Sequence, residues 1–326
     1  MIALILRRLA ALIPVLLGIS LLTFLLIQLA PGDYLSQMEM DPSVSRESLE
    51  AMRREFGLDR PAWQQYAIYL KNIVVDRDFG FSFSRRQPVI TILFESLGNT
   101  LILSLAAALL TWLLAIPLGV LAAVRQHSWV DRLASGAGMI GLAIPEVFLA
   151  LLLMLMAYKT GWFPVNGMRG LDHDSLSWFG QLLDIGHHLV LPALVLATVP
   201  LASRMRQMRA NLLDVLRADY VTTARAKGLT ERRVILRHAL PNALNPLITL
   251  FGYTIGGLLS GSFLVENVMG WPGLGRVAIE ALNTRDLYLV MGSVLMASTV
   301  LILGNLVADI LLVISDPRIR HGASDG

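Results

Sequence analysis

Long apolar runs alternate with short polar connections along this chain, and the runs are too long for the core of a soluble domain. Six of them reach about eighteen residues or more, the length that an α-helix needs to cross the hydrocarbon layer of a membrane. We therefore expect an all-α integral membrane protein with six transmembrane helices. The predicted spans are residues 9–29, 97–124, 134–158, 188–205, 242–265 and 287–314.

Basic residues fall in the short connections on one side of this predicted bundle. Lys and Arg mark the cytoplasmic side of membrane proteins, so we expect both the N-terminus and the C-terminus in the cytoplasm. The cations that set this orientation are Arg7, Arg8, Arg125, Arg132, the nine Arg and Lys residues of the segment 204–237, Arg318 and Arg320.

Composition narrows the class further. Of the 326 residues, 55% are hydrophobic and only 16% are charged, which supports an integral protein surrounded by membrane lipid. The net charge of +3 gives no case for a nucleic-acid partner, and the absence of cysteine excludes disulfides and thiolate chemistry. Residues 1–30 lack a small-residue cleavage site after their apolar run, so they read as an uncleaved first span.

The connection after the first span, residues 31–96, is long enough to fold into a small external cap. Pro42 and Pro61 each suit the first turn of a short helix, and Gly57 suits the end of the helix between them. Residues 88–95 read as an interfacial helix that leads into the second span. The apolar face of the second cap helix either packs within the cap or docks an external partner; it comprises Trp63, Tyr66, Leu70 and Ile73.

Two carboxylates fall inside predicted spans, where an ionisable group is costly unless it faces protein or water. Glu146 follows Pro145 near the middle of the third span. It either lines a pathway and contacts substrate, or accepts hydrogen bonds from donors that the proline kink frees. Asp309 lies one helical turn after Asn305, and there we expect an interhelical hydrogen bond.

A histidine-rich stretch precedes the fourth span. His187 and His188, with His173 and Asp172 nearby, fit no established metal-ligand spacing. We expect a solvated loop and no metal site.

Small residues and prolines recur within the spans. They either let a bundle move or simply allow close packing in a static one. They comprise the pairs Gly252–Gly256 and Gly257–Gly261, and the prolines Pro14, Pro117, Pro145, Pro192 and Pro200.

Sequence motifs for catalysis or nucleotide binding are missing. The chain contains no GxxxxGK[ST] phosphate loop, no HExxH and no GxSxG. The glycine-rich residues 270–276 follow a span and read as a turn. The chain is therefore not expected to be an enzyme or to bind a cofactor.

The connection between the fourth and fifth predicted spans, residues 213–241, is basic and ordered. Asp219 could cap a short helix over residues 220–227, Gly228 would allow a sharp turn into a second short helix, and Pro241 marks the next span. Small residues around Ala224 and Gly228 would form the exposed tip. The segment is either held to anionic lipid at ~1 kcal/mol per cation or inserted into a partner protein. Its apolar edge would be Val221, Ala224 and Leu229.

This segment resembles the EAA loop of permease subunits in ATP-binding-cassette importers. DYVTTARAKGLTERRVILRHALPNAL matches that loop at Ala224, Gly228, Leu240 and Pro241. Its TARAKGL form is similar to the peptide and nickel branch, and to dipeptide and oligopeptide permease B-type subunits. Further similar motifs are the ILRRL start, LAPGD at 29–33, FGLDRPAWQQY at 56–66, DFGFSF at 78–83, WPGLGR at 271–276 and DPRIRH at 316–321.

The resemblance implies the type I importer permease fold in a bacterial cytoplasmic (inner) membrane. It implies that a second homologous permease subunit pairs with this one, that two cytoplasmic ATPase subunits bind ATP and Mg²⁺, and that an external solute-binding protein delivers di- or oligopeptides. The parts would be residues 1–30, the cap 31–96, the permease core 97–314 with its coupling segment 206–241, and the tail 315–326. The residues implied in coupling are Asp219, Tyr220, Ala224, Arg225, Lys227, Gly228, Leu229, Leu240 and Pro241.

Alternatives remain for the cargo and for the class. Close relatives carry nickel chelates, glutathione or oligosaccharides. An ion-coupled secondary transporter or channel would show inverted repeats and more buried ionisable groups than Glu146 and Asp309, and it would leave the coupling segment unexplained. An intramembrane enzyme lacks a recognisable catalytic set.

Overall fold

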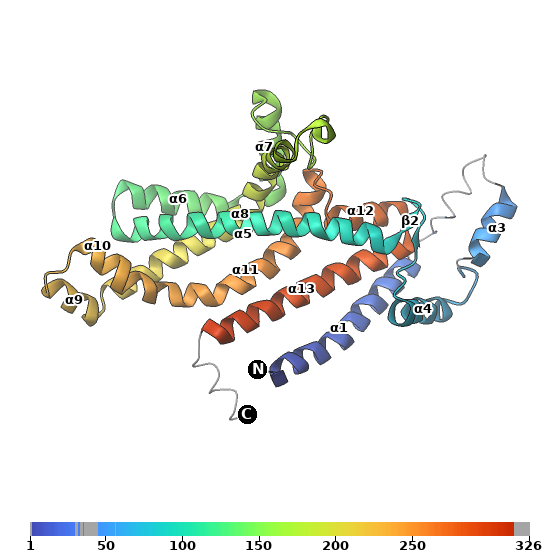
Figure 1. Ribbon diagram of the computed structural model, residues 1–326, viewed down its shortest axis with the longest axis horizontal. Coiled ribbons are helices and arrows are strands. Elements are labelled where there is room, and N and C mark those ends of the chain that lie inside the picture. The colour runs from blue at the N-terminus through green and yellow to red at the C-terminus, as the bar shows by residue number, and fades with distance from the viewer. Residues whose placement is uncertain (1, 30–31, 33–34, 36–44, 56, 316–326) are drawn as a thin grey trace. The chain divides into compact units, whose positions relative to one another are not determined.

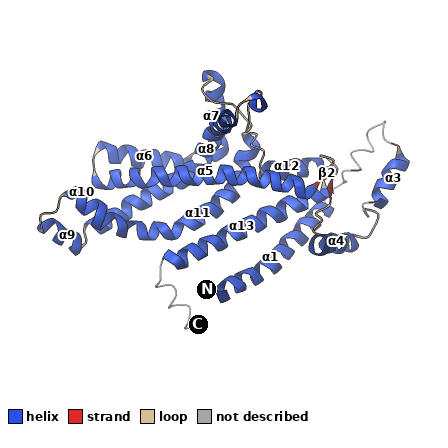
Figure 2. Ribbon diagram, in the orientation of Figure 1, coloured by secondary structure: helices blue, strands red, loops and turns tan. Residues whose placement is uncertain are grey.

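The computed structural model describes residues 2–29, 32, 35, 45–55 and 57–315. Helices account for nearly all of this part of the chain, and one short pair of strands accompanies them (Figure 1, Figure 2). The contacts divide the chain into two compact units. Unit 1 holds residues 1–100 and 272–302, and unit 2 holds residues 101–271 and 303–326.

Unit 1 combines long apolar helices with a small polar segment. A tight antiparallel hairpin pairs Phe81 with Pro88 and Ser82 with Gln87. The helix α5 begins directly after it, so residues 89–95 are helical as predicted, but no turn separates them from the second predicted span. The elements are α1 (Ile2–Leu29), α3 (Arg46–Glu55), α4 (Ala62–Lys71), the π-helical turn η1 (Asn72–Asp76), β1 (Phe81–Ser82), β2 (Gln87–Pro88), the start of α5 (Val89–Val124), α12 (Leu274–Thr284) and the start of α13 (Leu287–Ser315).

The helix α4 buries one face against α1. The Tyr66 ring lies 5.4 Å from the Phe24 ring, centroid to centroid, and its hydroxyl lies 2.8 Å from the Ser20 hydroxyl. Tyr69, one turn further, is buried in the same cluster. Trp63 is 69% exposed, so it lies outside the packed face that the sequence pattern predicts. Both helices of this segment were predicted, although Pro42 lies outside the described residues.

A buried carboxylate, Asp286, fastens the hairpin to the start of α13. One oxygen accepts hydrogen bonds from the Ser82 hydroxyl at 2.7 Å, the Ser84 hydroxyl at 2.9 Å and the Ser84 amide at 3.0 Å. The other oxygen accepts from the Leu289 amide at 3.3 Å, as a helix N-cap does. These four donors compensate the burial of the charge, because hydrogen bonds replace the water that the carboxylate loses.

Unit 2 is built on one long helix, α8. With 39 residues it is about 58 Å long, and α6, α7 and α11 all pack against it. A Cβ at Gly119 would lie 2.7 Å from the carbonyl oxygen of Met205, so this glycine lets α5 approach α8 closely. The remaining elements are α6 (Trp129–Ala143), α7 (Glu146–Thr160), the 3₁₀ turn η2 (His173–Ser175), α8 (Trp178–Leu216), α9 (Asp219–Ala226), α10 (Glu231–Arg233), the π-helical turn η3 (Val234–Ala239) and α11 (Leu240–Val268).

The third predicted span, residues 134–158, is not one continuous helix. The chain breaks between α6 and α7, which are bent by 106° to one another. Ile144 is extended there (φ −82°, ψ 122°), as a residue before proline prefers to be, and Pro145 has no amide to continue the helix. The other prolines singled out from the sequence lie inside continuous helices, namely Pro14, Pro117, Pro192 and Pro200.

Within the part of the chain that the structure describes, four helices are long and apolar enough to cross a membrane, or five if the bent pair counts as one span. The helix α11, which holds the fifth predicted span, is not among them, although it has 29 residues. Gly256 does serve close packing, since a Cβ at Gly304 of α13 would lie 4.0 Å from its Cα, but a Cβ at Gly257 would meet no atom within 4 Å. The side chain of Asp309 lies outside those that the structure describes.

The histidine-rich stretch before the fourth span is only partly solvated, which corrects the prediction: Asp172 and His187 are exposed, but His173 is buried and His188 is half-buried. Asp184 accepts a hydrogen bond from the Gly170 amide at 2.9 Å and lies 2.6 Å from Nδ1 of His173, which is only 6% exposed. His188 lies one turn further along α8, with its Nδ1 3.2 Å from the same carboxylate. The cluster pins the connection between α7 and α8 onto the first turns of α8. Among the described residues, no group of side chains has the arrangement of a metal site.

Candidate coupling site

The basic segment between α8 and α11 folds as a short helical hairpin at one end of unit 2 (Figure 1). The helix α8 ends at Leu216, and Ala218 turns the chain through an extended conformation into α9. Asp219 is not the N-cap, which corrects the prediction. The cap is Ala218, and Asp219 is the first helical residue, where a carboxylate favours the positive end of the helix dipole.

Gly228 ends α9 as the sequence predicts. Its φ of +76° lies in the left-handed region, which glycine adopts without steric cost. The Gly228 amide donates to the Arg225 carbonyl at 2.9 Å, and the Leu229 amide reaches back toward the Ala224 carbonyl at 3.4 Å. These two bonds form a Schellman motif, which satisfies the last carbonyls of the helix and fixes the direction of the turn.

The hairpin packs on an apolar cluster that it shares with α5, α8 and α11. Val221 is completely buried and Ala224 is only 7% exposed, so these two neighbours on the inner face of α9 anchor the helix. Ala224 therefore does not belong to an exposed tip of small residues; the structure corrects that expectation. The cluster comprises Met208 and Leu212 of α8 with Val234, Ala239, Ala243 and Leu247, and Leu229 and Leu240 pack against it.

A bidentate ion pair closes the turn on its outer side. The Arg225 guanidinium donates to the two carboxylate oxygens of Glu231, from Nε at 3.1 Å and from Nη2 at 2.6 Å. Its third nitrogen donates to the Leu216 carbonyl at 3.3 Å, at the end of α8. The hydrogen bonds lower the pKa of Glu231 and raise the pKa of Arg225. The two short helices are thus held in one geometry across Gly228.

A second contact ties α9 to the first turn of α11. The Asn242 amide donates to the Tyr220 hydroxyl at 3.0 Å and to the His238 carbonyl at 3.0 Å. Pro241 occupies the first turn of α11, which continues directly from the π-helical turn η3. Tyr220 is 45% exposed, so part of its ring remains available to another molecule.

The outer surface of the hairpin is polar and mostly cationic. A Cβ at Gly228 would meet no atom within 4 Å, so the turn itself faces open space. The exposed residues include Asp219, Thr222, Thr223, Ala226 and Lys227 of the first arm, with Arg217, Arg232, Arg233 and Arg237 beside it. A hairpin with satisfied backbone ends, an apolar core and an exposed basic surface can transmit a push or a pull with little internal deformation.

An ion pair that the sequence analysis missed joins α8 to α6. Arg209 donates to Asp131 from Nε at 2.6 Å and from a second nitrogen at 2.8 Å, and Asp131 is only 4% exposed. Asp131 also accepts from the His127 amide at 3.0 Å, and the Ser128 hydroxyl caps α6. The Ser128–x–x–Asp131 spacing resembles a capping box and marks the helix start, but no local pattern points to Arg209.

The charged residues deeper in unit 2 remain apart from the hairpin. Glu146 is partly buried and begins α7, next to the break. Among the described residues, none donates a hydrogen bond to its carboxylate, so the hypothesis of a structural acceptor gains no support. Arg204 of α8 has one described partner, the Thr254 hydroxyl at 3.4 Å.

Comparison with known families decides the class of this chain. Residues 115–321 match the family of binding-protein-dependent transport system inner membrane components, and residues 1–106 match its N-terminal part. The chain belongs to this family. As an inner membrane component of that kind, it carries the hairpin in the family's main region.

Curated relatives of this inner membrane component are similar over nearly their whole length. The oligopeptide transport system permease protein AppB of Bacillus subtilis is 42% identical and is matched over 98% of this chain and 100% of its own. The dipeptide transport system permease protein DppB of Escherichia coli K12 is 40% identical over 98% and 99%.

A solved structure shares the fold of this inner membrane component. An inward-facing form of the MetNI methionine ABC transporter has a TM-score of 0.54 at 19% identity, covering 69% of this chain and 96% of that one. The expected type I importer permease fold is thereby confirmed, while the count of six spans is not.

Proposed function

We propose that this chain is the membrane-spanning permease subunit of an ATP-driven importer for di- or oligopeptides. The observation that carries the proposal is the full-length similarity to relatives named as oligopeptide and dipeptide permeases. In this proposal the chain takes no chemical step. A second homologous permease subunit pairs with it, two cytoplasmic ATPase subunits bind ATP and Mg²⁺, and an external binding protein delivers the peptide.

The proposed topology has six crossings with both termini in the cytoplasm. The bent pair α6 and α7 counts as one crossing, and α11 supplies another, since its 29 residues extend about 43 Å. The segment of α3 and α4 then forms an external cap. The positions of Arg and Lys in the short connections support this orientation.

In the same proposal the hairpin of α9 and α10 is the coupling element that docks on an ATPase subunit. Its apolar core and its ion pair support the role, because a lever must keep its shape under load. Its exposed cations favour an acidic docking groove. Movement of the ATPase subunits would then shift the end of α8, and α8 contacts α6, α7 and α11.

Glu146 is the proposed cargo contact within the pathway. A partly buried carboxylate next to a helix break, without a described hydrogen-bond donor, suits the free amino group of a peptide. Glu146→Gln should therefore impair uptake of a peptide with a free amino terminus more than uptake of its N-acetylated form.

Reconstitution tests the function. The chain would be purified with the ATPase, partner permease and binding-protein products of its gene neighbourhood and placed in liposomes with internal ATP. We expect ATP-dependent uptake of labelled dialanine or a longer peptide, which stops when the binding protein is omitted. Uptake of a nickel chelate, glutathione or an oligosaccharide in place of every peptide tried would keep the class and overturn the cargo. Uptake driven by an ion gradient without ATP would overturn the class.

A further inference from the structure

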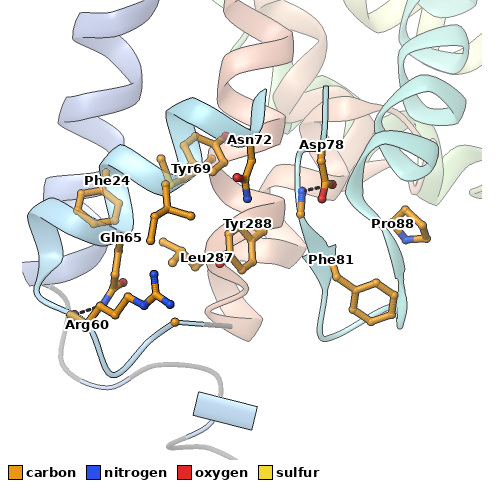
Figure 3. Close-up of a pocket in the computed structure, with 14 residues that line it drawn as sticks. Phe24, Arg60, Gln65, Tyr69, Asn72, Asp78, Phe81, Pro88, Leu287 and Tyr288 are labelled. Atoms are coloured by element: carbon orange, nitrogen blue, oxygen red, sulfur yellow. Dashed lines mark hydrogen bonds between the residues drawn. The ribbon is translucent and has the colours of Figure 1, made fainter. Parts of the chain in front are cut away.

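A cavity of about 410 Å³ lies within unit 1, beneath the helix α4 (Figure 3). This α4 cavity is bounded by α4 and η1, by the β1–β2 hairpin, and by single turns of α1 and α13. Its volume falls in the range of small-molecule sites. The side chains that matter for its chemistry are Phe24, Arg60, Tyr69, Asn72, Asp78 and Tyr288.

One wall residue carries a polar atom that the protein leaves unused. Tyr69 is only 4% exposed, and its buried hydroxyl has no hydrogen-bond partner within the part of the chain that the structure describes. A buried hydroxyl without a partner is destabilising, and such groups in native proteins call for an explanation. Burial raises the pKa of Tyr69, so its hydroxyl stays protonated and able to donate.

Two hydrogen-bond donors face the α4 cavity itself. The side chains of Arg60, on the loop before α4, and Asn72, in η1, both point into the α4 cavity (Figure 3). Neither side chain forms a hydrogen bond with another described residue. Gln65, by contrast, is already occupied, because its amide donates to the carbonyls of Leu58 and Arg60 at 3.2 Å and 2.8 Å.

A carboxylate, that of Asp78, lies on the side of the cavity formed by the β1–β2 hairpin. Asp78 uses one oxygen to accept the Gly80 amide at 2.8 Å, and its other oxygen has no described partner. Gly80 also brings the hairpin against the aromatic wall, since a Cβ there would lie 2.7 Å from the Tyr288 ring. The cavity therefore offers a cation and neutral donors, an anion, and an apolar wall between them.

We propose that the α4 cavity is a binding site for a small zwitterion with one anionic group and one primary ammonium group. The anionic group would accept hydrogen bonds from Arg60 and Asn72, with Tyr69 available beside them, and the ammonium group would donate to Asp78. A simple anion such as phosphate fits less well, because Asp78 would repel it. The same chemistry comes from two sources, the headgroup of phosphatidylethanolamine or a free amino acid or short peptide.

The test uses the full-length chain in nanodiscs of phosphatidylcholine and phosphatidylglycerol, with dialanine as the free zwitterion. Binding is measured by calorimetry, and N-acetyl-dialanine and dialanine amide serve as probes that each lack one charge. In parallel, the chain is extracted from membranes rich in phosphatidylethanolamine, and retained lipid is counted by native mass spectrometry. The variants are Arg60→Gln, Asp78→Asn and Tyr69→Phe, with Arg54→Gln on α3 as the matched control outside the cavity.

Dialanine binding that weakens about tenfold in Arg60→Gln and in Asp78→Asn, but not in Arg54→Gln, supports a free zwitterion as the ligand. Retained phosphatidylethanolamine that is lost in the same two variants, without dialanine binding, supports the lipid headgroup. Tyr69→Phe preserves the shape of the site, so it should fold, bind several-fold more weakly and show unchanged or higher stability without ligand. The proposal is overturned if neither ligand binds, if both charge-removing substitutions leave binding unchanged, or if the singly charged probes bind as well as dialanine. Peptide uptake is a separate readout, so this outcome leaves the proposed transport function standing.

Discussion

Two regions differ in whether their polar groups have hydrogen-bond partners within the protein. They are the helical hairpin between α8 and α11 and the segment around α4. In the hairpin, the Arg225 guanidinium bonds to Glu231 and to the Leu216 carbonyl, and the turn at Gly228 satisfies the end of α9. Around α4, the buried hydroxyl of Tyr69 has no described partner, and the side chains of Arg60 and Asn72 border a cavity. Polar groups that are fully hydrogen-bonded within the protein suit an element that must keep its shape. Polar groups without partners around a cavity suit an element that binds a ligand.

The two regions also differ in how they are anchored. Val221 and Ala224 seat α9 on an apolar cluster that includes α8, so movement of the hairpin reaches the longest helix of unit 2. The helix α4 is seated on α1 through Tyr66 and Phe24, while Trp63 remains exposed. The substitutions below test whether hydrogen bonding of the polar groups within the protein distinguishes a rigid coupling element from a ligand-binding segment.

The largest effect should come from Gly228→Val. A β-branched residue at a φ of +76° costs roughly 1–3 kcal/mol, which would distort the turn that joins α9 to α10. We expect peptide uptake to be abolished while the membrane fraction still contains the protein at the wild-type level, as measured by labelled uptake and immunoblotting.

Gly228→Asn is the matched control, because asparagine tolerates the left-handed region. It should retain most of the uptake, since a Cβ at this position meets no neighbour within 4 Å. Wild-type uptake in Gly228→Val would contradict the coupling role of the hairpin. Equal loss of uptake in both variants would mean that the absence of a side chain at position 228, and not its backbone conformation, is what coupling requires.

A smaller but still severe loss of stability is expected for Asp286→Ala, which removes a hydrogen-bond acceptor from buried polar groups of unit 1. The substitution leaves the hydroxyls of Ser82 and Ser84 and two amides without their acceptor, and it removes the N-cap of α13. Loss of such a buried acceptor should cost about 3 kcal/mol of unfolding free energy. Thermal unfolding of the purified chain in detergent would measure it.

Asp214→Ala, at an exposed carboxylate, is the control for Asp286→Ala and should change the unfolding temperature little. A shift for Asp286→Ala no larger than that of the control would show that the four donors find other acceptors.

Sequence reasoning reached the parts of the molecule that local chemistry decides. Apolar length predicted the long helices, and Gly228 and Pro241 predicted the helix break and the entry to α11, because φ preference and a missing amide act within one turn. The bend of 106° after Ile144 needed more than a proline, since Pro117 and Pro192 lie inside continuous helices.

Contacts between distant residues escaped prediction. Asp131 and Arg209 are 78 positions apart, so neither spacing nor charge pattern reveals their ion pair. Ala224 was assigned to an exposed tip because small residues suit a docking surface, whereas packing against the α8 cluster buries it. Asp286 lies directly before a long apolar run, a pattern that predicts a helix N-cap. Its hydrogen bonds to the β1–β2 hairpin depend on the fold and could not be predicted.

The smallest effect should come from the ion pair that closes the hairpin. Arg225 and Glu231 are 40% and 55% exposed, so their coupling free energy should be only about 0.2–1 kcal/mol. A double-mutant cycle of Arg225→Gln and Glu231→Gln, read from hydrogen exchange of the α9 amides, would measure it. Because the pair lowers the pKa of Glu231, the coupling is present above the ordinary glutamate pKa and is lost as the pH falls through the lowered value. A coupling that persists after the carboxylate is protonated would mean that the Schellman turn and the apolar core hold the hairpin without the ion pair.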